Sequence, residues 1–184
     1  MGGYNPVFDD RKLQELVLFV ATRSKDDPGF DAMKLNAILY YADFYAYRRL
    51  GRPISGANYQ KFADGPAAQQ LPAARESLER AGLIEIEKRP AADEGQQRIV
   101  ATQSFEPELL SKDEVSLADE VIALLRQKTG REAADMAREE PGWKTVDYRE
   151  TIPYTTAWLS SQRLTPDQLE RARRMAKKHE LLGR

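Results

Sequence analysis

The stretch that most constrains the fold is KLNAILYYADFYAYRRLGRPISG, residues 34–56, because it places five aromatic side chains among the eight residues 40–47. In a helix that turns about 100° per residue, its aliphatic side chains fall on one stripe roughly 120° wide. The members of that stripe are Leu35, Ile38, Leu39, Ala42, Ala46 and Leu50. A second stripe of Tyr40, Phe44 and Tyr47 lies on roughly the opposite side. A helix with two apolar stripes is not an ordinary half-exposed surface element.

Two arrangements satisfy such a helix. It either runs through the centre of the domain, or it offers its second stripe to a partner protein. Tyrosine suits both settings, since its ring buries apolar area while its hydroxyl keeps a polar contact. Aromatic stripes at helical spacing more often pack in a core, which favours the buried arrangement. In the partner arrangement, we expect these residues to be exposed or half-exposed contacts: Tyr40, Phe44, Tyr47, Arg48, Tyr59 and Lys61.

Helix signals dominate the remaining sequence. Caps and apolar periodicity predict helices after Asp9-Asp10, from Asp31 to about Leu50, from Gly65-Pro66 to Gly82, from Ser111 to Gly130, and over 131–140. The clearest start is Ser111, which forms a capping-box pattern with Glu114.

The adjacent acidic pairs are expected to cap or solvate helix ends, because neighbouring side chains on a helix diverge. These pairs are Asp9-Asp10, Asp26-Asp27 and Glu139-Glu140.

Short strands are predicted at 58–62, 83–87 and 98–101, the last two paired as a hairpin. With no internal repeat and no flexible linker, we expect a mainly α fold, one compact helical domain with a small β-hairpin or short sheet. We assign residues 1–162 to that domain. Residues 163–184, with seven basic and three acidic side chains, are expected to form a charged C-terminal helix packed on it or extending from it.

The composition bears on the compartment. The chain of 184 residues has no cysteine, which suits a reducing compartment, and the cytoplasm is the default. Its apolar runs are too short to cross a membrane, and its first residues lack the pattern of a signal peptide. We therefore expect a cytoplasmic protein with no membrane contact.

Residues for catalysis do not converge in this sequence. The single histidine, His179, lies among charged residues near the end of the chain. The sequence has no glycine-rich phosphate loop, nucleophile elbow or two-histidine metal spacing. We expect a protein that is not an enzyme and that uses no cofactor or metal.

DNA binding is the main alternative, because residues 66–82 followed by the predicted hairpin copy the recognition helix and wing of a winged-helix regulator. That helix carries Arg75 and Arg80 against Glu76 and Glu79, and the whole chain has a net charge of −1. Affinity for a polyanion depends on counterion release, which so few surplus cations barely provide. We therefore expect nucleic acid not to be a partner, and we keep a winged-helix-like transcriptional regulator as the alternative.

The chain resembles the Panacea domain, or SocA-like antitoxin family. Four ordered features carry the resemblance: Lys34-Leu35 through Tyr40-Tyr41-Ala42-Asp43-Phe44, then Gly51 to Gly56, Gly65-Pro66, and Leu78 to Ile84, with Trp143 as a fifth. The resemblance implies a largely helical, non-enzymatic antitoxin of a bacterial or phage-borne type II-like toxin–antitoxin system. Its implied partner is a cognate toxin, encoded by the adjacent gene, which it neutralises by direct contact. Adaptor-type members of the family imply a protease as a further partner.

Overall fold

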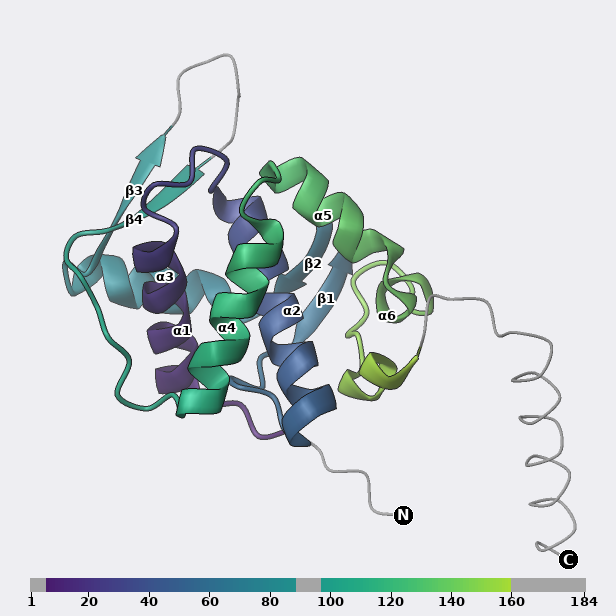
Figure 1. Ribbon diagram of the computed structural model, residues 1–184. Helices are drawn as coiled ribbons and strands as arrows, with labels where there is room; N and C mark the ends of the chain where they lie inside the picture. The colour runs from purple at the N-terminus through teal and green to yellow at the C-terminus, as the bar shows by residue number, and fades with distance from the viewer. Residues whose placement is uncertain (1–5, 89–96, 160–184) are drawn as a thin grey trace, which may run out of the picture.

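A long central helix organises the computed structural model, which describes residues 6–88 and 97–159 (Figure 1). This helix, α2 (Ala32–Leu50), packs against α1 (Asp10–Arg23), α4 (Lys112–Leu125) and α5 (Gly130–Glu139). It also contacts a short 3₁₀ helix, η2 (Tyr154–Trp158). Both of its apolar stripes are covered, and most side chains from residue 34 to residue 47 are buried. The structure confirms the buried-centre interpretation and the mainly α fold.

Both predicted ends of α2 are confirmed. The side chain of Asp31 accepts a hydrogen bond from the backbone N–H of Lys34 at 2.7 Å, which caps the N-terminus. Gly51 ends the helix in the left-handed region at φ 76°, where a side chain would be strained. The assignment of Leu50 to the core stripe is wrong, because it lies in the last turn and is 36% exposed.

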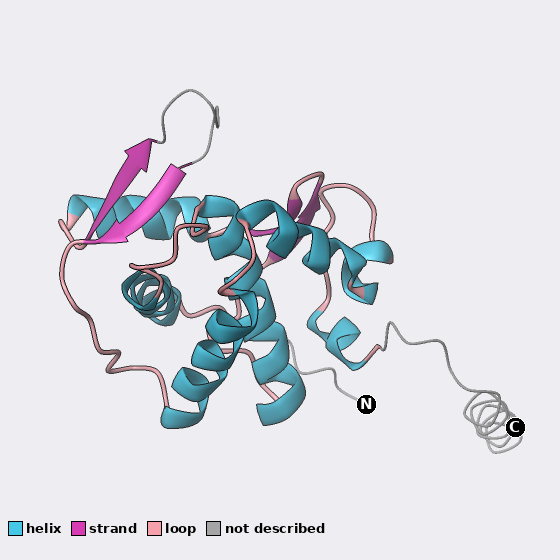
Figure 2. Ribbon diagram, turned by 45° about the horizontal axis from the view of Figure 1, so that its top comes forward, coloured by secondary structure: helices cyan, strands magenta, loops and turns pink. Residues whose placement is uncertain are grey.

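Two antiparallel hairpins lie on different sides of the helices (Figure 2). Strands β3 (Ile84–Lys88) and β4 (Gln97–Ala101) form the predicted hairpin, and β1 (Tyr59–Phe62) pairs with β2 (Gly65–Ala68). The expected helix start at Gly65-Pro66 is wrong, since these residues begin β2 and the helix α3 spans Leu71–Arg80. Gly65 adopts a φ of 110°, and a Cβ there would lie 3.4 Å from Ala134 in α5. A turn and a close packing contact account for this glycine.

The C-terminal half contains two consecutive capping boxes. Ser111 and Glu114 start α4 as predicted, but α4 ends at Leu125 rather than at Gly130. Thr129 and Glu132 form the second box, and Gly130 is the first residue of α5. A Cβ on Gly130 would lie 2.1 Å from the Asp31 carboxylate, so only glycine fits beside the cap of α2. After α5 come the short helix α6 (Pro141–Lys144) and then η2.

A buried lysine near the start of α2 forms an ion pair with the loop between α1 and α2 and hydrogen bonds with the loop between α4 and α5. The Nζ atom of Lys34 lies 2.5 Å from Oδ2 of Asp27 and also donates to the carbonyls of Arg126 and Lys128. The expectation that the Asp26-Asp27 pair merely caps or solvates a helix end is therefore wrong for Asp27, which is buried. A buried carboxylate needs this partner, because unpaired buried charge is strongly destabilising.

Three expectations lie outside the described residues: the hairpin tip at 90–95, the C-terminal helix over 163–184, and the setting of His179. Within residues 6–88 and 97–159, no helix combines the length and the hydropathy needed to cross a membrane.

Candidate partner-binding surface

Four of the six predicted contact residues form a buried aromatic cluster instead. Tyr40, Phe44 and Tyr47 are 2%, 4% and 8% exposed, and Tyr59 is fully buried. The rings of Tyr40 and Phe44 lie 4.3 Å apart, centre to centre. Tyr154 of η2 stacks on Phe44 at 4.6 Å and packs against Tyr47 at 5.6 Å. The expected exposure of these four residues is wrong, because η2 and β1 cover the second stripe of α2.

A buried carboxylate positions β1 and the preceding loop beneath α2. The backbone N–H and the hydroxyl of Ser55 donate to Asp43, and the Tyr59 hydroxyl donates to it at 2.8 Å. Desolvation raises the pKa of Asp43 above its ordinary value, although these three hydrogen bonds oppose the shift. The motif Gly51 to Gly56 thus serves as a structural loop anchored on α2.

A small hollow, here termed the inner hollow, opens between α2, α6 and η2. Its volume is about 40 Å³, which admits the tip of one side chain. The Tyr41 hydroxyl donates to Glu140 there at 3.2 Å, and partial burial raises the pKa of that carboxyl. The lining residues are Tyr40, Tyr41, Phe44, Tyr45, Arg48, Glu140, Gly142, Thr156, Ala157 and Leu159.

The rim of the inner hollow is rich in arginine and exposed apolar side chains. Arg48 is exposed as predicted, and a shallow depression of about 370 Å³ runs past Arg48, Arg49 and Tyr45. Arg49 pairs with Glu120 of α4 at 2.5 Å. On η2 and just after it, Trp158 is 62% exposed and Leu159 is 49% exposed. Adjacent apolar side chains that form a contiguous exposed patch, unlike those scattered singly, often mark contact sites.

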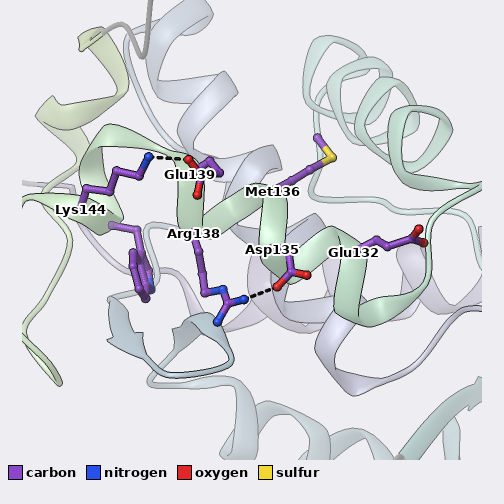
Figure 3. Close-up of a pocket in the computed structure, with 7 residues that line it drawn as sticks. Glu132, Asp135, Met136, Arg138, Glu139 and Lys144 are labelled. Carbon is purple, nitrogen blue, oxygen red and sulfur yellow. Dashed lines mark hydrogen bonds and ion pairs between the residues drawn. The ribbon is translucent and has the colours of Figure 1, made fainter.

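A second depression, the outer hollow, lies on the other side of α6 along α5 (Figure 3). Its volume is about 600 Å³. Its charges pair with one another, since Arg138 contacts Asp135 and Lys144 lies 2.5 Å from Glu139. The lining residues are Glu132, Asp135, Met136, Arg138, Glu139, Trp143 and Lys144.

Lys61, the sixth predicted contact residue, lies beside the outer hollow and is half-buried as expected. Its Nζ atom sits 4.2 Å from the centre of the Trp143 ring and donates to the carbonyl of Val146 at 2.8 Å. The structure therefore does not bring Lys61 together with Arg48, because α6 separates them.

The periodicity of apolar residues does not predict the exposed aromatic residues of this surface. Tyr148 and Trp158 are both more than half exposed, and Tyr148 stands edge-on to Phe62 at 5.8 Å. Both belong to short segments without helical or strand periodicity, so the pattern of apolar residues gave no signal. Trp143 was noted only through the family resemblance.

The charges on α3 and the β3–β4 hairpin offer little to a nucleic acid. Arg75 donates to Gln97 at 2.6 Å, and Arg80 pairs with Glu76. Arg98 donates to the carbonyl of Lys25. Three of the cations that would contact phosphates in a winged-helix protein, Arg75, Arg80 and Arg98, are thus engaged within the domain.

The described residues contain no group of three or more His, Cys, Asp or Glu side chains that could hold a metal ion. Fold and surface together define a small, mainly helical domain with a buried central helix and an arginine- and aromatic-rich surface around α6. The chain belongs to the antitoxin SocA-like, Panacea domain family, whose family model matches residues 35–144. The match runs from the first turn of α2 to the end of α6. No curated protein and no solved structure matches the chain.

Proposed function

We propose that this protein is a cytoplasmic antitoxin that neutralises a toxin by direct protein–protein contact. The observation that carries the proposal is the coincidence of family membership with an exposed surface suited to binding. Tryptophan, tyrosine and arginine are the residues most enriched at the energetic centres of protein interfaces. Arg48 and Trp158 supply two of these residue types at or beside the inner hollow, and Leu159 adds exposed apolar surface.

The two hollows favour a protein partner over a small molecule. The inner hollow, at about 40 Å³, is far below the volume of roughly 300 Å³ or more that drug-sized ligands occupy. The outer hollow is larger, but its lining charges are paired with one another and give a ligand few free polar groups. We propose that the protein works without catalysis, by covering a surface that the toxin needs.

Delivery of the toxin to a protease is a variant of the same proposal. An adaptor needs two partners, and the inner and outer hollows lie on different sides of α6. The two versions differ in the fate of the toxin, which persists in a stable complex when it is neutralised and disappears when it is delivered.

The test is co-expression with the product of the neighbouring gene. Expression of that gene alone should stop growth, and this protein should restore growth and co-purify with the product at a fixed stoichiometry. Toxin levels followed after synthesis is blocked distinguish neutralisation from delivery. If the neighbouring product neither harms growth nor forms a complex, the proposal is wrong for that pair of genes.

A further inference from the structure

Three arginines, Arg48, Arg49 and Arg52, lie in the last turn of α2 and just after it. This end of α2 lies near η2 in Figure 1. Arg49 pairs with Glu120, and Arg52 lies 3.7 Å from Glu114. Within residues 6–88 and 97–159, Arg48 forms no hydrogen bond or ion pair, although it is exposed. Its charge is near enough to Glu140 to oppose the burial that raises the pKa of that carboxyl, but no hydrogen bond or ion pair joins these two side chains, so the guanidinium can still make a charge-assisted, two-pronged contact with a partner carboxylate.

Apolar surface adjoins this guanidinium. The inner hollow, which Arg48 borders, is lined by Ala157, Leu159 and rings of α2, together with the Glu140 carboxyl. Trp158 projects next to it with 62% of its surface exposed. A partner side chain that lies here meets a cation and exposed apolar side chains within the same small area.

We infer that this surface binds an acidic, partly apolar segment of the partner protein, with a partner carboxylate on Arg48 and an apolar side chain against Trp158 and Leu159. This inference rests on the proposed function and specifies the chemistry of the partner. A buried Arg–carboxylate contact gives an interface orientation as well as affinity, because the two planar groups align.

Charge argues against the nearest alternative occupant, the protein's own C-terminal residues. Residues 160–184 follow Leu159 directly and carry seven basic side chains against three acidic ones. Like charge would oppose their placement on an arginine rim. Nucleic acid is the other alternative, but Arg49 and Arg52 already face carboxylates, so few counterions would be released on binding.

The experiment measures binding of the purified product of the neighbouring gene to the full-length protein and to charge-reversal variants. Arg48→Glu removes the cation, and Trp158→Ala removes the exposed apolar ring. Arg126→Glu is the matched control, because Arg126 is also exposed but lies at the end of α4, near the opposite end of α2. Thermal melting checks that all variants fold.

We expect Arg48→Glu to weaken binding at least tenfold at low salt, with a smaller loss at 0.5 M NaCl, and Arg126→Glu to change it less than twofold. Trp158→Ala should weaken binding tenfold at both salt concentrations. If the wild-type complex forms and Arg48→Glu behaves like Arg126→Glu, the inference is overturned while the antitoxin proposal stands. If nuclease treatment dissolves the complex, the inference is also overturned, because nucleic acid then holds the complex together. If the wild-type protein forms no complex, both proposals fall.

Discussion

The hydroxyl of Tyr59 donates a 2.8 Å hydrogen bond to Oδ2 of Asp43, and neither side chain has any solvent exposure. Ser55 supplies the other two donors to this carboxylate. No cation is hydrogen-bonded or ion-paired to it among the described residues. The interior therefore holds a carboxyl group that depends on three neutral donors, and its protonation should affect stability.

Asp43→Asn should abolish a specific pH dependence of stability. Burial raises the pKa of Asp43 in the folded protein, so folding favours the protonated form. The stabilisation is complete below the unfolded pKa of about 3.9 and is lost as pH rises through the folded pKa. The free energy of unfolding of the Asn variant, relative to wild type, should therefore increase with pH over this window. Urea denaturation at several pH values measures it, and a difference that stays constant with pH would contradict the assignment.

Phe44→Ala should destabilise the fold itself. Phe44 packs against Tyr40 and Tyr154 in the buried cluster, and removal of a buried phenyl ring typically costs about 3–5 kcal/mol. Arg48→Ala, one helical turn further along α2, should change stability by less than about 0.5 kcal/mol because its side chain is exposed. Chemical denaturation of both variants compares them. Equal, small losses would mean that the ring is not buried as described.

Lys61→Met should change the fluorescence of Trp143. The ammonium group of Lys61 lies 4.2 Å from the ring centre, and a cation in this position perturbs the indole and stabilises the contact by roughly 1 kcal/mol. A Trp158→Phe background leaves Trp143 as the sole tryptophan, since the chain has two. A Lys25→Met variant, which changes an exposed lysine far from Trp143, serves as the control. Identical emission spectra for both lysine variants would refute the stacking.

Arg149→Gly should leave stability unchanged or raise it by up to about 1 kcal/mol. Arg149 has a φ of 69°, where a side chain costs about 1–2 kcal/mol and glycine fits without strain. The larger backbone entropy of glycine in the unfolded chain offsets part of the gain. Arg126→Gly, at an exposed residue with a φ of −54°, should instead destabilise by about 0.5–1 kcal/mol. The melting temperature of Arg126→Gly should fall, whereas that of Arg149→Gly should stay the same or rise, and a clear loss for Arg149→Gly would count against the left-handed geometry.

The sequence predicts elements whose signals are local. The caps and the two stripes of α2 lie within the helix, and the capping box of α4 spans four residues, so both were found correctly. The roles of Gly65 and Gly130 were not found, because each is set by a distant contact, with Ala134 and with Asp31. Glycine occurs both in turns and at helix ends, so the sequence alone does not distinguish these two roles.

Only part of the candidate surface was predictable, because local signals identify some of its residues while distant segments decide whether others are exposed. Arg48 follows the buried portion of α2 and is exposed because the covering elements end before it. Tyr40 and Phe44 line the inner hollow yet are buried, since Tyr154, more than 100 residues later, stacks over the cluster. Periodicity shows that a helix has a second apolar face, but it does not show which later segment covers that face.

The central position of α2 has a consequence for how such a protein diverges. Most of its rings are buried, so substitutions along most of the helix should be destabilising, whereas Arg48, Arg49 and Leu50 in its final turn are exposed. Under the proposed function, duplicated copies could exchange a few side chains at that end and on η2 and so bind a different toxin. The buried part of the helix would stay the same.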